Sequence, residues 1–209
     1  MHIPPFVADY PEFDGDPTWV HWPLHQPRSA TSTSIRRFGF LLQHPNMQMV
    51  NDHGRRSKAG KALEHEADHP WLLAQVVGGE QFPGPNALKR FVRERSPDES
   101  TWPHPPPNGH EELVALGPSA LPLPGSATAE QGRPPDDRHL AYDAQGRLLA
   151  FIACSNDAVL PQHCLQVWSL EDQGWPVLVS VHYRRTLLAD WGLIQRGVTD
   201  ALLAMRAQQ

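Results

Sequence analysis

Apolar and polar residues alternate along two stretches in the second half of the chain, residues 139–155 and 164–185. Alternation is typical of β-strands with one buried face, and each stretch is interrupted by a short polar segment that contains glycine. We therefore predict two antiparallel hairpins, with turns at residues 144–146 and 171–174.

The pattern changes to a helical period after the second hairpin. Residues 186–207 carry large apolar side chains three or four positions apart, which places them on one face of a helix. These residues are Leu187, Leu188, Trp191, Ile194, Val198, Leu202 and Met205. We expect a C-terminal helix that packs on the sheet through this face.

The first half of the chain predicts mainly helices. Segments 57–67 and 70–79 have helical spacing, and a glycine pair at the end of the second segment is a stop signal. A third predicted helix starts at Asn86, a residue type that favours the N-cap, and ends before Pro97. The apolar run at 34–45 fits either a buried strand or one or two helical turns.

Proline content divides the chain further. The chain has 22 prolines, which are dense in residues 1–27, interpreted as an extended arm, and in residues 97–138, interpreted as a linker or insert. Between them lies a mainly helical basic region, 28–96, which we expect to pack with the sheet region, 139–209. The predicted fold class is therefore α+β: a helical N-terminal half, a Pro-rich connection, and a small antiparallel sheet of two hairpins backed by a C-terminal helix.

The composition is that of an ordinary globular protein. The chain has 209 residues, of which 40% are hydrophobic, and a formal net charge of -5, which fits neither a disordered nor a strongly basic protein. Two cysteines, Cys154 and Cys164, are too few for a disulfide scaffold or a cysteine zinc site, and we expect them to be small buried residues. Neither a signal peptide nor a membrane-length apolar run is evident, so we expect a cytoplasmic protein without membrane contact.

Residues 65–69 read His-Glu-Ala-Asp-His and resemble the HExxH motif of the zincin metallopeptidases. On an unbroken helix, His65 and His69 would lie on one face and could ligate one Zn²⁺. Glu66 would then lie beside the open coordination position and act as the general base. The resemblance implies a zinc-dependent hydrolase with zinc as cofactor.

Two features of the same segment argue against zinc. Pro70 disfavours helical geometry at His69, and Asp68 places a charge where the motif has an uncharged residue. A simpler interpretation is that one helix ends near residue 67 and Pro70 starts the next. A zinc site would also need a third ligand, for which the candidates are Glu80, His110 and Glu111.

Segment 71–95 resembles a helix-turn-helix, with a small residue early in the first helix and a glycine at the turn. The connection is several residues longer than the usual tight turn, and the basic residues also fit the solvent-exposed face of a surface helix. The resemblance implies a nucleic-acid-binding protein, in which base and phosphate contacts would be made by Asn86, Lys89, Arg90, Arg93 and Arg95.

The preferred hypothesis is a non-catalytic adaptor without a cofactor that binds a protein partner or a second copy of itself. The acidic net charge disfavours nucleic acid, because nonspecific affinity for nucleic acid comes from positive charge. Trp19 and Trp22 in the proline-rich arm are the candidate partner-binding residues, since aromatic side chains supply much of the binding energy of protein interfaces.

Overall fold

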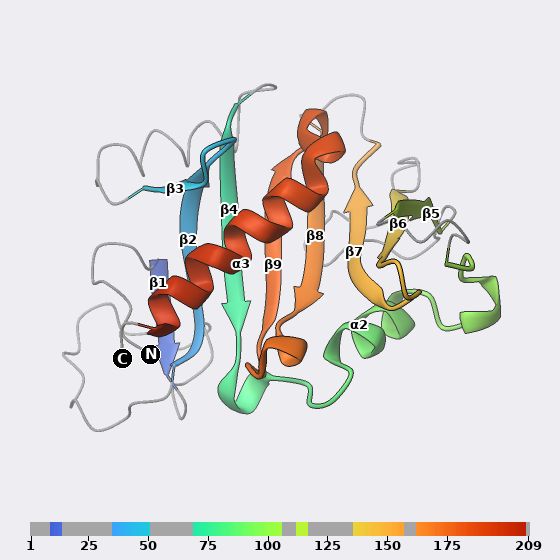
Figure 1. The fold of residues 1–209 in the computed structure, drawn as a ribbon, viewed down its shortest axis with the longest axis horizontal. Helices are drawn as coiled ribbons and strands as arrows, with labels where there is room; N and C mark the ends of the chain where they lie inside the picture. The colour runs from blue at the N-terminus through green and yellow to red at the C-terminus, as the bar shows by residue number, and fades with distance from the viewer. Residues whose placement is uncertain are drawn as a thin grey trace, which may run out of the picture.

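The computed structural model describes residues 9–13, 35–50, 69–105, 112–116, 136–156 and 162–207. In these residues nine strands form one sheet in the order β1-β2-β4-β9-β8-β7-β6-β5, with β3 paired to β2 (Figure 1). Every neighbouring pair of strands is antiparallel. The strands are β1 (Asp9–Phe13), β2 (Ile35–Gln43), β3 (Gln48–Met49), β4 (Trp71–Val77), β5 (Glu112–Ala115), β6 (Asp137–Tyr142), β7 (Leu148–Cys154), β8 (His163–Ser169) and β9 (Leu178–Arg184).

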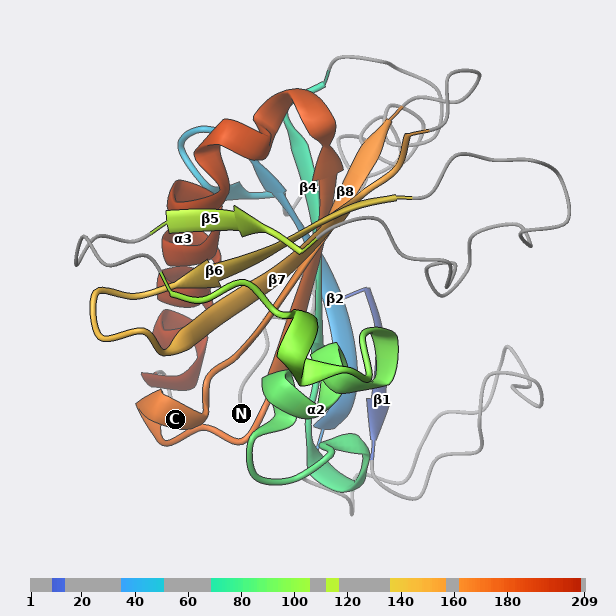
Figure 2. The same ribbon diagram turned by 90° about the vertical axis from the view of Figure 1, so that its right-hand side faces the viewer.

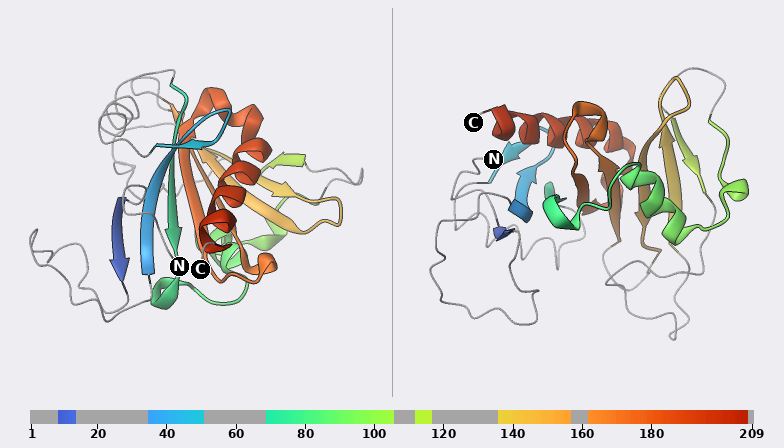
Figure 3. Two further views of the ribbon diagram at one scale, coloured as in Figure 1. Left: turned by 60° about the vertical axis from the view of Figure 1, so that its left-hand side comes forward. Right: turned by 90° about the horizontal axis from the view of Figure 1, so that it is seen from below.

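One α-helix packs on each face of the sheet (Figure 2). The longer helix, α3 (Trp191–Ala207), crosses one face diagonally, and the shorter helix, α2 (Ala87–Arg95), lies on the other face. Seen from below, α3 and α2 lie on opposite sides of the strands (Figure 3). The 3₁₀ helices are η2 (Gly79–Gln81), η3 (Glu99–Thr101), η5 (Glu171–Gln173) and η6 (Arg185–Asp190).

The larger core lies between α3 and the sheet. Ile194, Val198 and Leu202 recur every fourth residue on one face of α3 and are fully buried. Two polar side chains also join the sheet to the helix: the Gln166 amide donates to Gln195, at 3.1 Å, and the indole of Trp168 donates to Thr199, at 3.2 Å. The strand residues of this core include Phe38, Phe40, Leu42, Leu72, Ala74, Val76, Val179 and Val181.

The smaller core lies between α2 and the other face of the sheet. Leu88 and Val92 of α2 pack in one apolar cluster with Phe151 and Val167. The ring of Phe91 also contacts the ring of Phe151 edge-on, with 5.7 Å between their centroids. The cluster under α2 therefore contains residues of β6, β7 and β8, and Leu178 at the start of β9. Among the described residues, β2 and β4 contribute nothing to it.

The predicted fold class is wrong, because the described part of the chain has no helical N-terminal half. The described residues of region 28–96 contribute β2, β3 and β4 to the sheet and, among them, only one α-helix, α2. β4 pairs with β9, so the strands from this region and the predicted hairpins form one continuous sheet. The segment expected as a linker, 97–138, contributes β5 and the start of β6.

The predicted helix at 70–79 is instead the central strand β4. Leu72, Ala74 and Val76 are buried and alternate with partly exposed residues, which is the period of a strand. β4 has β2 on one side and β9 on the other, so its backbone hydrogen bonds are satisfied within the sheet. The apolar run at 34–45 is likewise a strand, β2. The predicted helix at 57–67 lies outside the described residues.

The two predicted hairpins and the C-terminal helix are present as elements of this larger sheet. The first hairpin pairs β6 with β7, and the Asp143 carboxylate accepts hydrogen bonds from the backbone N–H groups of Gln145 and Arg147 in its turn. Gly146 has φ 76°, a value that favours glycine. The second hairpin pairs β8 with β9, and η6 leads from β9 into α3.

Candidate functional site

A pocket of about 230 Å³ lies where the start of β4, the start of β8 and the end of β9 meet. The antiparallel register places Leu73 opposite His182 and His163 opposite Arg184. Because directly paired residues share a face of the sheet, these four side chains lie on the face that carries α2, and none of them belongs to the apolar cluster under α2. The lining residues are His69, Leu73, His163, His182, Tyr183 and Arg184.

Two histidines on neighbouring strands form one wall of this pocket. The ring centroids of His163 and His182 are 6.4 Å apart. Burial, together with the nearby His163, lowers the pKa of His182 to about 4, because both disfavour the charged imidazolium. His182 is therefore neutral at pH 7, whereas His163 is exposed at the rim.

Tyr183 and Arg184, which are adjacent on β9, point to opposite faces of the sheet. Tyr183 belongs to the core under α3, where its hydroxyl donates to the Gln166 side chain at 3.1 Å, and burial raises the pKa of that hydroxyl. Its ring therefore faces away from the histidine side of the strand. Arg184 points to the opposite face from Tyr183, is buried at 2% exposure and is one of the residues that line the pocket.

His69 closes the pocket at the start of β4, and its geometry disfavours the zinc interpretation. It lies outside any helix, one residue before Pro70, and its Nδ1 accepts a hydrogen bond from the backbone N–H of Trp71 at 3.1 Å. A neutral imidazole whose Nδ1 accepts a hydrogen bond carries its proton on Nε2, so neither nitrogen offers a lone pair to a metal. The helical geometry that the zinc hypothesis requires at His69 is absent, in agreement with the effect expected of Pro70.

Most of the other residues of the zinc hypothesis lie outside the described residues. His65, Glu66, His110 and Glu111 all lie there, and Glu80 is an exposed residue of η2. Within the described ranges, no group of three or more His, Cys, Asp or Glu side chains is placed to hold a metal ion. The absence of zinc stays a prediction.

The basic residues of α2 are held by groups of the protein itself. The Glu99 carboxylate of η3 forms an ion pair with Lys89 at 3.1 Å and accepts a hydrogen bond from Nε of Arg93 at 2.6 Å. The hydrogen bonds from Arg93 and then Lys89 hold the pKa of the Glu99 carboxyl below its usual value. Arg90 donates to the carbonyl of Pro83 at 2.7 Å. Arg95 donates to the carbonyl of Phe91, with its guanidinium 3.5 Å from the centre of the Phe91 ring.

The N-terminus of α2 is also paired with a group of the protein itself. Asn86 is the N-cap residue, but it has φ 59° and its side chain makes no capping hydrogen bond. The carboxylate of Glu171 accepts instead from the backbone N–H groups of Asn86 and Ala87, at 3.1 and 3.0 Å. The negative charge of Glu171 thus lies at the positive end of the helix dipole.

The predicted helix-turn-helix at 71–95 is not formed. Its first helix is β4, a central strand of the sheet, and η2 separates that strand from α2. Segment 71–95, all of which the structure describes, therefore holds no second α-helix against which α2 could pack as a helix-turn-helix requires. The proposed roles of the basic residues in binding nucleic acid remain predictions without structural support. Trp19 and Trp22, the predicted partner-binding residues, lie outside the described residues.

His163, His182 and Arg184 were not predicted as site residues from the sequence. The available signal was their spacing along the predicted strands. His182 and Arg184 are two positions apart on one strand and so share a face, and His163 is the first residue of the strand paired with it. A correct register would have brought these three residues to one face and one end of the hairpin.

Comparisons with known proteins give little further information. No protein-family model matches the chain, and no curated protein sequence matches it. The fold is similar to the solved structure of Smlt3025, an immunity protein of the Stenotrophomonas maltophilia type IV secretion system, with 15% sequence identity and a TM-score of 0.47. The match covers 80% of this chain and 81% of that one. Among the described residues, no helix is long and apolar enough to cross a membrane.

Proposed function

We propose that this protein is a non-catalytic binding protein and that its protein partner inserts an acidic side chain into the histidine-lined pocket. One observation carries the proposal: the described lining consists of three histidines, one arginine, Leu73 and Tyr183, and it contains no acidic residue. Concave sites with an apolar wall and a few converging polar groups are typical of binding sites.

The chemistry of the lining favours a carboxylate over other side chains. Imidazolium and guanidinium groups both donate hydrogen bonds to carboxylate oxygens, and such charge-assisted bonds are stronger than those between neutral groups. His163 lies exposed at the rim, where an incoming side chain would meet it first. Leu73 would contact the methylene groups of an Asp or Glu side chain.

The proposed contact makes binding depend on pH. A carboxylate bound beside His182 favours the imidazolium, so the pKa of His182 is higher in the complex than in the free protein, where it is about 4. Binding then takes up protons, and the affinity rises as the pH falls from 7 towards 5. Binding of a neutral or basic partner group would have no such dependence or the opposite one.

Nucleic acid is a weaker candidate for the partner. Lys89 and Arg93 of α2 already pair with Glu99, so phosphate would have to compete with a carboxylate of the protein itself. The overall net charge of -5 also opposes nonspecific attraction to phosphate.

The test uses a charge change at the pocket and a matched change elsewhere. His163→Glu places a negative charge at the exposed rim of the pocket. Gln173→Glu adds the same charge at an exposed position of η5, at the opposite end of the β8–β9 hairpin. Each variant and the wild type would be used to capture protein from extracts of the native cells. The affinity for any stoichiometric partner would then be measured with purified components.

We expect His163→Glu to weaken binding at least about tenfold, which corresponds to about 1.4 kcal/mol. Gln173→Glu should bind as the wild type does. A partner that binds His163→Glu with unchanged affinity would show that the pocket is not the binding site. Failure of the wild type to hold any protein in stoichiometric amount would contradict the proposed function itself.

A further inference from the structure

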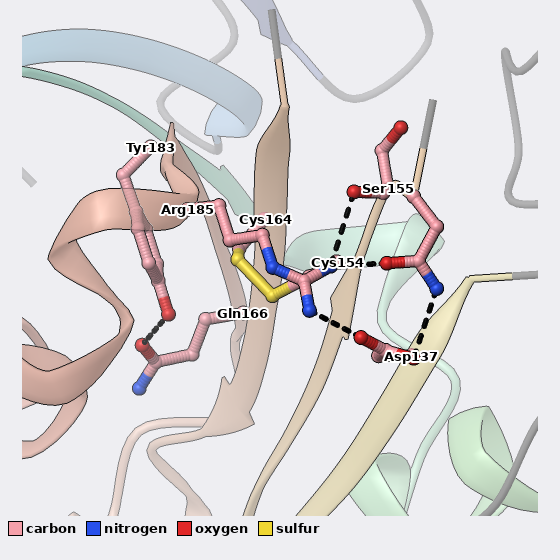
Figure 4. The surroundings of a disulfide bond; sticks show 8 residues. Asp137, Cys154, Ser155, Cys164, Gln166, Tyr183 and Arg185 are labelled. Atoms are coloured by element: carbon pink, nitrogen blue, oxygen red, sulfur yellow. Dashed lines mark hydrogen bonds and ion pairs between the residues drawn. A yellow bond between two sulfur atoms is a disulfide. The ribbon is translucent and has the colours of Figure 1, made fainter. Parts of the chain in front are cut away.

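The two cysteines of the chain are joined by a disulfide between adjacent strands. Cys154 ends β7, Cys164 lies near the start of β8, and the two residues pair directly in the sheet register. Both side chains belong to the core under α3 and are fully buried. The expectation that both are buried is therefore met, but as a bonded pair rather than as two free thiols (Figure 4).

The disulfide is part of a larger connection between the ends of four strands. The Arg185 guanidinium, just after β9, pairs with Asp137 at the start of β6 and donates to the carbonyl of Ser155 at 3.2 Å. Asn156 donates to the Asp137 carboxylate at 2.9 Å. The hydrogen bonds from Asn156 and then Arg185 hold the pKa of Asp137 below its usual value. Figure 4 shows the Arg185–Asp137 pair beside the disulfide.

We propose that the Cys154–Cys164 disulfide is a permanent part of the fold and that the protein folds and acts in an oxidising compartment, not in the reducing cytosol. In such a compartment the two thiols lose two protons and two electrons by thiol–disulfide exchange. The disulfide of an oxidising thiol carrier is reduced to a dithiol in the same step. Cytosolic thiol systems keep ordinary cysteine pairs reduced, so a structural disulfide indicates an oxidising environment.

Burial distinguishes a structural bond from a redox switch. Exchange requires a thiolate to reach one of the two sulfur atoms, and regulatory disulfides are therefore exposed or strained. Here both cysteines have 0% exposure. The folded protein should consequently keep its disulfide in the presence of a moderate concentration of dithiothreitol, and lose it once denaturant is added.

The closed loop is short, because the two cysteines are ten positions apart in the sequence. Linking two chain positions restricts the unfolded chain and so stabilises the folded state. We expect complete reduction to lower the midpoint of thermal unfolding by about 5–10 °C. The double variant Cys154→Ala/Cys164→Ala should have the lower midpoint with or without reductant.

The decisive experiment counts free thiols in the full chain. Intact native cells would be treated with N-ethylmaleimide, which enters cells. The protein would then be denatured without reductant but with N-ethylmaleimide still present, so that buried free thiols also react, and weighed by mass spectrometry. We expect no maleimide on the native protein. The same chain produced in the reducing cytosol of an expression host should carry two maleimides.

Each other outcome contradicts a definite part of the proposal. Two maleimides on the native protein would show that the bond does not form where the protein acts. No maleimide in either sample would show that the bond forms in the cytosol too, and so carries no information on compartment. Rapid reduction of the folded protein, or an unchanged unfolding midpoint after reduction, would show that the disulfide is not a structural part of the fold.

Discussion

The two faces of the sheet differ in how completely they are covered. On one face, the 17 residues of α3 cover a core that includes residues from β2, β4, β7, β8 and β9. On the other face, the nine residues of α2 cover only part of the sheet, and the remaining strand ends carry histidine, arginine and a pocket. The first face is apolar, as a stable core requires. The second face carries polar side chains at the pocket, where we propose that the partner binds.

The largest expected effect separates the two faces by stability. Ile194→Ala removes a fully buried side chain from the core under α3 and should cost about 2–5 kcal/mol of unfolding free energy. Leu88→Ala, on the smaller α2 face, removes a side chain that is 7% exposed and should cost less. Urea denaturation of both variants measures the difference. Wild-type stability of Ile194→Ala would mean that α3 does not complete the core.

The second prediction concerns pH and the pocket face. The pKa of His182 is about 4 in the folded protein and near 6.5 when unfolded, so the unfolded chain binds more protons between these values. Its contribution to stability is therefore fully present above pH 6.5 and is lost as the pH falls towards 4. His182→Gln should remove up to about 3 kcal/mol of the pH dependence in this window.

The measurement for His182 is the unfolding free energy of the wild type and His182→Gln at pH 7 and pH 4.5. Burial also lowers the pKa of His139, which is not among the lining residues, so His139→Gln should remove a separate contribution of its own and leave that of His182 in place. An identical pH dependence in the wild type and His182→Gln would refute the neutral, buried state of His182.

The smallest effect tests how tightly the β2–β3 turn packs on α3. A Cβ atom at Gly197 would clash with Cγ of Met47. We expect Gly197→Ala to destabilise the protein by about 1–2 kcal/mol, because overpacking outweighs the gain in helix propensity. Adding Met47→Ala should recover most of the loss, as thermal unfolding can measure. Increased stability of the single variant would show that the turn moves away at little cost.

The parts of the fold that the sequence predicted depend on local interactions. The first hairpin turns through hydrogen bonds between Asp143 and residues at most four positions away, and α3 is specified by its own spacing. The strand β4 was predicted as a helix because its apolar run fits both periods. Its pairing with β2 and β9 decides the outcome, and β9 lies about a hundred residues later in the chain.

The candidate site was harder to predict than the fold for the same reason. Its residues come from the start of β4, the start of β8 and the end of β9, so they meet only through the register of the sheet. The prominent local motifs were poor guides. The basic residues of α2 are paired within the protein, and His69 of the HExxH sequence uses its Nδ1 to accept a backbone hydrogen bond.

The most direct test of the binding proposal is the pKa of His182 in the free protein and in the complex with its partner. The ring proton signals of His182, assigned with His182→Gln, would be followed by NMR as the pH is varied. We expect the pKa to rise from about 4 in the free protein towards or above 6.5 in the complex, because a bound carboxylate favours the imidazolium. An unchanged or lower pKa in the complex would contradict the proposal that an acidic side chain of the partner occupies the pocket.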